Sequence, residues 1–85
     1  MLAEKVKFIR INEVKAISGL KRSTLYAYIS QGIFPSQIKL GERCVAWIES
    51  EILAINQARI AGKSAQEIKE LVRQLIAQRQ QVSSQ

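Results

Sequence analysis

The feature that most constrains this fold is a glycine placed between two short stretches whose apolar residues have helical spacing. Val14 and Ile17 lie three residues apart, so they share one face of a helix predicted over residues 12–18. Asn12 is of a type favoured at the N-cap of such a helix. Gly19 follows directly and supplies the backbone freedom with which helices commonly end. The first helix is therefore expected to lead into a tight turn.

The second stretch predicts a helix over residues 22–31, which ends at Gly32. Leu20 places an apolar side chain in the turn between the two helices. The inner stripe of the second helix consists of Leu25, Tyr28 and Ile29. Two short helices joined by a tight turn form the helix-turn-helix pattern, which here covers residues 12–31.

A small β-hairpin is predicted after the helix pair. Pro35 cannot serve in the middle of a sheet, so residues 33–35 form a connector. Residues 38–40 and 44–47 alternate as strands around a three-residue loop, 41–43, which contains a glycine. Because an isolated two-stranded ribbon is marginal in water, one strand face should pack on the helices. The residues interpreted as core, and not as stacking platforms or nucleophiles, are Tyr28, Phe34, Cys44 and Trp47.

Two further helices are predicted beyond the hairpin. The third covers residues 49–60, and its inner stripe consists of Ile48, Ile52 and Ile55, widened by Leu53 and Ile60. Ser64 and Glu67 have the spacing of a capping box, which opens a fourth helix over residues 64–82 that frays from Val82 onward. The apolar stripe of this helix consists of Ile68, Leu71, Val72, Leu75 and Ile76. The stripe needs a partner, which is either its own domain or the same helix of a second copy.

The second helix of the pair carries the residues that point to DNA. When a helix-turn-helix docks, the N-terminal part of its second helix enters the major groove and reaches phosphates and base edges. The residues that helical geometry turns outward are Arg22, Ser23, Tyr26 and Ser30. Lys21 and Arg22 bring positive charge, with Arg22 as the base-reading candidate, while Thr24 is placed to brace the start of the helix. The alternative interpretation is two amphipathic helices with a solvated polar face.

The hairpin could act as a wing beside the reading helix. Lys39 is expected to point outward, and Arg43 lies at the tip, where it can reach the backbone or a minor groove. Glu42, its neighbour, would repel phosphate. The alternative for Arg43 is an ordinary solvated turn residue, since charged loop tips are common.

The charge of the chain favours a polyanionic partner. Thirteen Lys and Arg residues against seven acidic ones give a formal charge of +6. The chain has neither His nor Asp and a single cysteine, so the usual general base, catalytic triads and metal-ligand clusters are missing. We therefore expect no enzyme activity, no cofactor and no metal. With no apolar run near the ~20 residues of a bilayer span and no signal peptide, we expect a cytoplasmic, nucleoid-associated protein without a membrane partner.

Five short motifs occur in order along the chain: Phe8-Ile-Arg-Ile, Gly19-Leu-Lys-Arg-Ser-Thr-Leu-Tyr, Gly32-Ile-Phe-Pro, Lys39-Leu-Gly-Glu-Arg and Trp47-Ile-Glu-Ser-Glu-Ile. Together they resemble the AlpA family of small regulators encoded by prophages and genomic islands, over residues 8–60. The resemblance implies a MerR-like winged-helix fold related to excisionases. It also implies DNA binding that activates integrase genes or directs excision.

The resemblance assigns roles to individual residues. Those it places in the DNA-reading helix or the wing are Arg22, Ser23, Thr24, Tyr26, Lys39 and Arg43. Lys21 stands where a serine commonly caps the helix, and Ala27 and Ser30 stand where many relatives are basic. The wing and neighbouring copies are therefore expected to add to DNA binding.

The predicted fold is mainly α with a small β-hairpin, a winged helix-turn-helix plus a C-terminal helix. The predicted function is that of a sequence-specific protein of a mobile element that binds and bends double-stranded DNA, as a transcriptional regulator or a recombination directionality factor. Because small winged modules make few base contacts, it would act as a dimer or as several copies on adjacent sites. The alternative is an interaction module whose C-terminal helix docks an integrase or polymerase subunit. The predicted segments are a lead-in (1–7), the winged domain (8–60), a linker (61–63), the amphipathic helix (64–82) and a tail (83–85).

Overall fold

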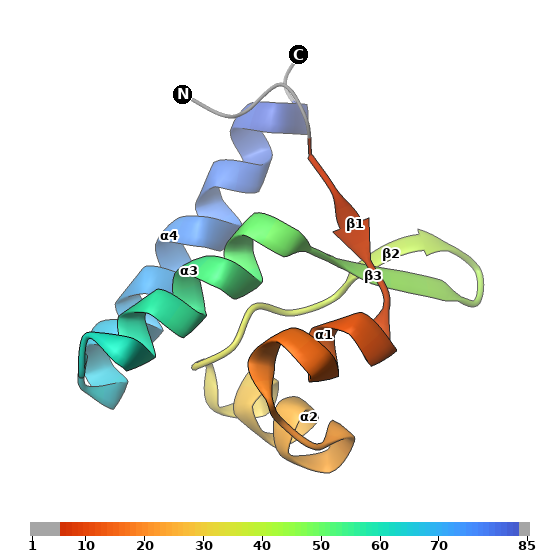
Figure 1. The fold of residues 1–85 in the computed structure, drawn as a ribbon. Helices are drawn as coiled ribbons and strands as arrows, with labels where there is room; N and C mark the ends of the chain where they lie inside the picture. Colours follow the sequence, from red (N-terminus) through yellow and green to blue (C-terminus); the bar gives the residue numbers. More distant parts are fainter. Residues whose placement is uncertain (1–5, 84–85) are drawn as a thin grey trace.

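Four helices and three short strands make up residues 6–83, the part of the chain that this computed structural model describes, with the side chains of residues 81–83 excepted. In chain order the elements are β1 (Phe8–Ile9), α1 (Ile11–Ser18), α2 (Arg22–Gln31), β2 (Ile38–Gly41), β3 (Cys44–Ile48), α3 (Glu49–Ile60) and α4 (Ala65–Ser83). Figure 1 shows β2 and β3 projecting to one side, with α1 and α2 below them and α3 and α4 on the other side. The predicted winged helix-turn-helix with an additional C-terminal helix is confirmed.

The helix-turn-helix is formed by α1 and α2, and its turn depends on Gly19. This residue has a φ of 74°, in the left-handed region that favours glycine, and its N–H donates to the Lys15 carbonyl at 2.8 Å. Helix α1 begins at Ile11 with Arg10 as its N-cap and without a side-chain cap. The prediction that Asn12 caps this helix is wrong, because the helix starts directly where the preceding strand ends.

The hairpin belongs to a three-stranded sheet with the order β1-β3-β2. Strand β1 pairs antiparallel with β3, and Ile9 lies opposite Trp47. The N–H of Glu49 donates to the Lys7 carbonyl at 2.9 Å, so the pairing continues to the first residue of α3. The sequence pattern does not predict β1, because a two-residue strand is too short to show alternation. Lys7, assigned to the lead-in, therefore makes a backbone contact with the domain.

The turn of the hairpin is tighter than predicted. Gly41 pairs with Cys44, so the loop consists of residues 42–43 alone and the prediction of a three-residue loop is wrong. The register shifts just before Gly41, which makes Leu40 the extra residue of a β-bulge. A bulge bends its strand and increases the local twist. The tip of the hairpin is therefore aimed by the bulge as well as by the turn.

Trp47 lies at the centre of the core. It is fully buried, and its indole N–H donates to the Pro35 carbonyl at 3.1 Å, which attaches the connector to the sheet. Phe34 is buried as predicted, whereas Tyr28 and Cys44 are only half-buried. The other buried members of the core cluster are Ile9, Val14, Leu25, Ile52, Ile55, Ala58, Ile68 and Val72. Residues from both ends of the described chain thus belong to one core cluster.

The inner face of α3 is narrower than predicted. Ile52 and Ile55 are buried, but Leu53 and Ile60 are 45% and 86% exposed, so the prediction that they widen this face is wrong. Each residue turns an α-helix by about 100°, so Leu53 lies a quarter-turn away from Ile52. Two apolar side chains of α3 therefore face solvent.

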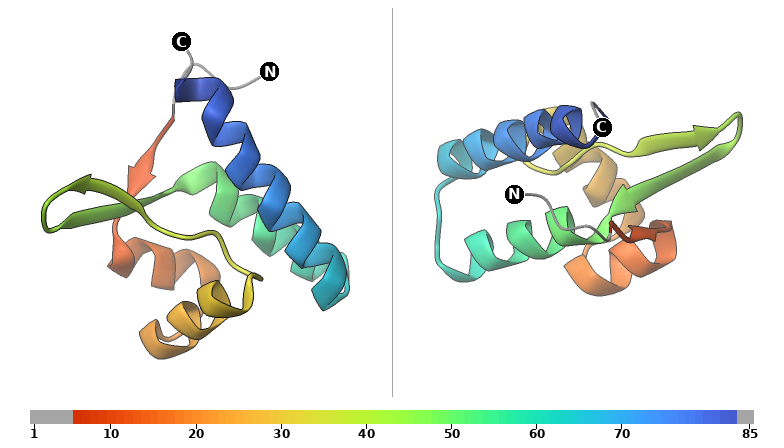
Figure 2. Two further views of the ribbon diagram at one scale, coloured as in Figure 1. Left: turned by 180° about the vertical axis from the view of Figure 1, so that it is seen from behind. Right: turned by 90° about the horizontal axis from the view of Figure 1, so that it is seen from above.

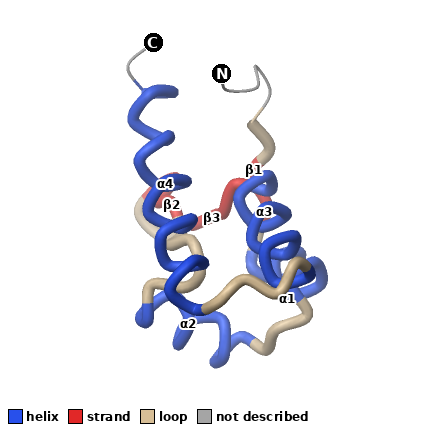
Figure 3. The backbone as a smooth tube through the Cα atoms, turned by 90° about the vertical axis from the view of Figure 1, so that its left-hand side faces the viewer, coloured by secondary structure: helices blue, strands red, loops and turns tan. Residues whose placement is uncertain are grey.

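Helix α4 turns back along α3 and packs on its own chain (Figure 3). Ile68 and Val72 are buried in the common core, and the partly buried side chains packed against that core include Leu71, Leu75 and Ile76. Of the two partners considered for the apolar stripe of α4, its own domain and a second copy, the structure shows its own domain. A partner that docks through this stripe would have to displace α4 from its own domain.

The start of α4 is the predicted capping box. The Ser64 N–H donates to the Glu67 carboxylate at 2.9 Å, and the Glu67 N–H donates to the Ser64 hydroxyl at 3.1 Å. The helix runs to Ser83, one residue beyond the predicted end, and residues 84–85 lie outside the described part of the chain; fraying from residue 82 stays a prediction.

Candidate nucleic-acid interface

The N-terminal end of α2 carries positive charge that no carboxylate offsets. Its N-cap is Lys21, which makes no side-chain cap, and its first turn contains no acidic residue. The first helical bond runs from the Leu25 N–H to the Lys21 carbonyl at 2.8 Å, so the amides before Leu25 have no helical acceptor. Helix α3, by contrast, has Glu49 and Glu51 in its first turn. The start of α2 is therefore suited to an anion such as a phosphate.

The exposed face of α2 is small and polar. Arg22 and Ser23 are exposed as predicted, and Thr24 is half-buried, in keeping with its expected place at the start of the helix. Ala27 is also exposed, and it was not among the predicted contact residues because its short apolar side chain carries no hydrogen-bonding group. A methyl group on this face can still contact the methyl group of thymine. The exposed face of α2 thus combines one arginine with short side chains.

Tyr26 was predicted to point outward from this face, but it does not project freely into solvent. It is half-buried, and its ring lies edge-on to Trp47, with 6.2 Å between the ring centroids and an interplanar angle of 64°. Tyr26 and Ile29 are three residues apart, so they lie next to each other on the same side of α2. This places Tyr26 at the edge of the inner stripe and not on the exposed face. The ring thus joins α2 to the base of the wing.

The wing carries the other two predicted cations. Lys39 is exposed and pairs with Val45, and residues paired across an antiparallel ladder project to the same face of the sheet. Lys39 therefore lies on the face of the hairpin that also carries Trp47. Arg43 is exposed in the turn, next to Glu42. Figure 2 shows the hairpin extending past α1 and α2 in both views.

The four predicted cations differ from Lys7, Arg73 and Arg79 in having no ion-pair partner, and they share this with several other cations of the described residues. Within residues 6–83, no carboxylate pairs with Lys21, Arg22, Lys39 or Arg43. Lys7, Arg73 and Arg79 do form ion pairs with glutamates. Cations without a protein partner can bind phosphates without first breaking an ion pair. The structure thus brings unpaired positive charge to the start of α2 and to the wing, on two elements that Tyr26 and Trp47 connect.

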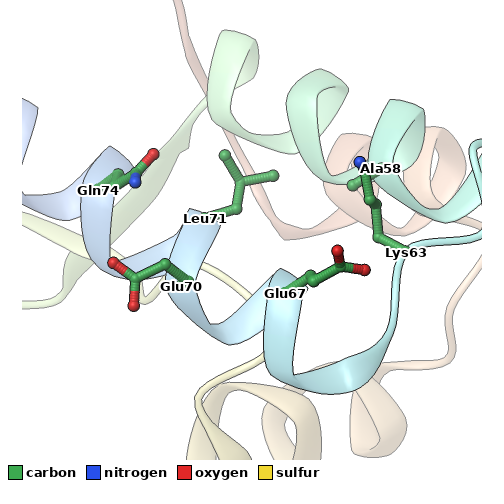
Figure 4. A pocket seen from close by; sticks show the side chains of 6 residues that line it. All are labelled: Ala58, Lys63, Glu67, Glu70, Leu71 and Gln74. Atoms are coloured by element: carbon green, nitrogen blue, oxygen red, sulfur yellow. The ribbon is translucent and has the colours of Figure 1, made fainter.

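A shallow pocket of about 220 Å³ lies elsewhere, between α3 and α4 near the turn that joins them (Figure 4). Its lining residues are Ala58, Lys63, Glu67, Glu70, Leu71 and Gln74. Hydrogen bonding from the Ser64 backbone holds the pKa of the Glu67 carboxyl below its ordinary value, helped by nearby Lys63. Glu70 pairs with Arg73 at 3.4 Å. The acidic groups of this pocket thus serve the local structure of α4.

Two further findings concern other kinds of site. In the described residues, no three His, Cys, Asp or Glu side chains gather closely enough to hold a metal ion. No helix between residues 6 and 83 combines the length and the apolar character needed to cross a membrane.

Comparison with known proteins gave two matches. The sequence profile of a family described as "Prophage CP4-57 regulatory protein (AlpA)" matches residues 7–60, which include all seven predicted contact residues. An uncharacterized protein, ORF88 of Enterobacteria phage P4, is 47% identical over 57 residues, which are 67% of this chain and 65% of that protein. The match thus spans slightly less than two thirds of the relative's length. No solved structure gave a significant match.

Proposed function

The chain belongs to the AlpA family of prophage regulatory proteins, which implies a DNA-binding regulator of a mobile element, and we propose that it recognises a specific sequence through α2 and the wing. In this proposal the N-terminal end of α2 enters the major groove. Arg22 contacts base edges there, with Ser23 and Thr24 beside it. Lys21, Lys39 and Arg43 contact phosphates on either side of the groove.

The observation that carries the proposal is the set of unpaired cations on the start of α2 and on the wing. Lys7, Arg73 and Arg79 pair with glutamates elsewhere in the described chain. Other described cations are also unpaired, so what distinguishes these four is their place together on the start of α2 and on the wing. At the proposed interface these side chains are free to neutralise DNA phosphates, and the cations condensed on the DNA are then released, which favours binding. The same end of α2 also offers backbone amides to a phosphate.

The size of the protein suggests more than one copy on the DNA. Its longest dimension is 34 Å, close to the ~34–36 Å that separate equivalent points one turn apart on B-DNA. With its long axis along the duplex, one copy would cover about one turn and insert a single helix. Because each inserted helix makes few base contacts, useful specificity requires a dimer or copies on adjacent turns. We further propose that binding of these copies bends the DNA.

The proposed biological outcome is control of a mobile element, either by regulating transcription of an integrase gene or by directing excision. Both outcomes need only binding and bending, in agreement with a surface made of cations and short polar side chains. We propose that the protein acts by shaping a DNA complex in the cytoplasm, without catalysing a reaction itself and without a cofactor.

A titration of labelled duplexes by fluorescence anisotropy tests the binding proposal. The duplexes are the attachment site and the integrase promoter of the element that carries this gene, with random DNA as reference. Arg22→Ala should weaken binding to the specific duplex by about 1–3 kcal/mol and reduce discrimination against random DNA. Arg73→Ala is the matched control, since Arg73 is an exposed arginine on α4 that pairs with Glu70. Equal affinities of wild type and Arg22→Ala would refute the assignment.

The two outcomes can be separated with the same protein. An excision assay with purified integrase and a circularisable substrate reports directionality, and a promoter-fusion assay reports regulation. Energy transfer between dyes at the ends of the bound duplex reports bending. A straight duplex at saturation would remove bending from the proposal while leaving sequence recognition intact.

A further inference from the structure

The segment between the reading helix and the wing is held by one arginine of the C-terminal helix. Arg79 donates twice to the Glu51 carboxylate, from Nε at 2.9 Å and from Nη2 at 2.6 Å. The same Nη2 donates to the Ser36 carbonyl at 2.8 Å. The Arg79 and Glu51 side chains are only 19% and 6% exposed. One guanidinium thus joins α4, the first turn of α3 and the segment of residues 32–37 between α2 and β2, which includes the predicted connector and is called the connector from here on.

The connector determines where the wing stands relative to α2, because residues 32–37 form the direct link between them. Its backbone carbonyls are held at two neighbouring points. Trp47 donates to the Pro35 carbonyl at 3.1 Å, and Arg79 donates to the next carbonyl, that of Ser36. Ile38, the first residue of β2, follows two residues later. The path of the chain into the wing is therefore fixed immediately before the strand starts.

A guanidinium is suited to this arrangement because it presents a planar fork of donors that binds a carboxylate with two bonds and retains further N–H groups. A lysine could meet the charge of Glu51 but could not reproduce the fork. No buried side-chain polar atom of the described residues lacks a hydrogen-bond partner, so this buried charge is fully compensated. Removing Arg79 alone would leave Glu51 buried and unpaired.

We propose that Arg79 is a positioning residue for DNA binding, which holds the wing at the angle that lets Arg43 reach the DNA together with α2. This inference rests on the proposed function. Arg79 lies on α4, outside residues 7–60 that match the family. The C-terminal helix of this chain thereby contributes to the DNA interface without touching DNA.

The test uses the full chain with the double substitution Glu51→Met/Arg79→Met. Replacing both partners of a buried ion pair by apolar residues of similar size commonly preserves folding, whereas the donor to the Ser36 carbonyl is lost. Arg43→Ala and Arg22→Ala are each introduced into the wild-type and the double-substituted background, and the affinity for the specific duplex is measured. Arg79→Lys, which keeps the charge, serves as the milder variant.

We expect the loss caused by Arg43→Ala to be smaller in the double-substituted background by about threefold or more, while the loss caused by Arg22→Ala is the same within about twofold. In an Arg79→Lys background, the loss of affinity caused by Arg43→Ala should lie between the losses in the wild-type and the double-substituted backgrounds. A general loosening of the fold would change the losses caused by Arg43→Ala and by Arg22→Ala to the same extent. If Arg43→Ala lowers the affinity equally in the two backgrounds, the proposal is overturned.

Hydrogen exchange without DNA separates this inference from the proposed function. The β2–β3 amides should exchange faster in Glu51→Met/Arg79→Met, while those of α1 and α2 keep their wild-type protection. If the wild-type protein binds none of the duplexes, the proposed function fails, and exchange still decides whether Arg79 holds the wing. Unchanged exchange in the hairpin would overturn that role.

Discussion

Two isoleucines in neighbouring helices offer a matched test of whether α4 is part of the folded domain. Ile68 on α4 is 4% exposed and lies in the core cluster, whereas Ile60 at the end of α3 is 86% exposed. Ile68→Ala removes three buried carbon groups, which at about 0.8 kcal/mol each lose about 2.4 kcal/mol of transfer free energy. The cavity left behind adds to this, so the total loss should be about 3–4 kcal/mol, within the range for buried isoleucine.

Thermal unfolding followed by circular dichroism measures the difference. For a domain of this size, each kcal/mol lowers Tm by about 4–8 °C, so Ile68→Ala should lower it by at least about 12 °C. Ile60→Ala makes the same chemical change at an exposed helical site and should alter stability by no more than about 0.5 kcal/mol. Helix propensity favours alanine in both variants, so it does not account for the contrast.

The shape of the transition carries further information. If α4 belongs to the same cooperative unit as the helix-turn-helix, Ile68→Ala shifts one single transition and leaves its denaturant slope unchanged. Equal midpoints for the two variants, or a separate early transition for α4, would refute the view that this helix completes the core.

Three smaller predictions follow from single contacts. The pKa of the Glu67 carboxyl is lowered in the folded protein, so its charged form stabilises α4 at a pH above the ordinary glutamate pKa, and this stabilisation is lost as the pH falls through the folded pKa. In urea titrations, the difference in unfolding free energy between wild type and Glu67→Gln should therefore shrink between about pH 6 and about pH 3. Gly19→Ala should destabilise by about 1–2 kcal/mol in the same titrations through its φ of 74° alone, since nothing lies within 4 Å of the added Cβ; an unchanged midpoint would contradict this. We propose that the Tyr26 hydroxyl donates a hydrogen bond to DNA; Tyr26→Phe keeps the ring contact with Trp47 and should unfold like wild type, and loss of that bond should lower DNA affinity about fivefold in anisotropy titrations.

The helix-turn-helix could be predicted from the sequence because its determinants are local. Val14 and Leu25 mark the inner faces of two helices, and Gly19 marks the turn between them, all within about a dozen residues. The capping box at Ser64 is equally local, since both of its hydrogen bonds join residues three apart. Patterns of this kind depend on helical geometry and not on the rest of the fold.

The features that escaped prediction depend on distant parts of the chain. Strand β1 consists of two residues and exists through its pairing with β3. The partners Arg79 and Glu51 are separated by 28 residues, and a lone arginine on a helix normally indicates a solvated face. Tyr26 is amphipathic and lies at the edge of the inner face of its helix, where either orientation is open to it, and its contact with the distant Trp47 decides between them.

The salt dependence of DNA binding tests the proposed interface most directly. If Lys21, Lys39 and Arg43 each neutralise one phosphate, the slope of log K against log salt should be about −2.7, and affinity should fall about 40-fold between about 50 and 200 mM salt. Arg43→Ala should reduce the magnitude of the slope by about 0.9, and Arg73→Ala should leave it unchanged. A slope near zero, or one that Arg73→Ala changes as much as Arg43→Ala does, would contradict DNA binding through α2 and the wing.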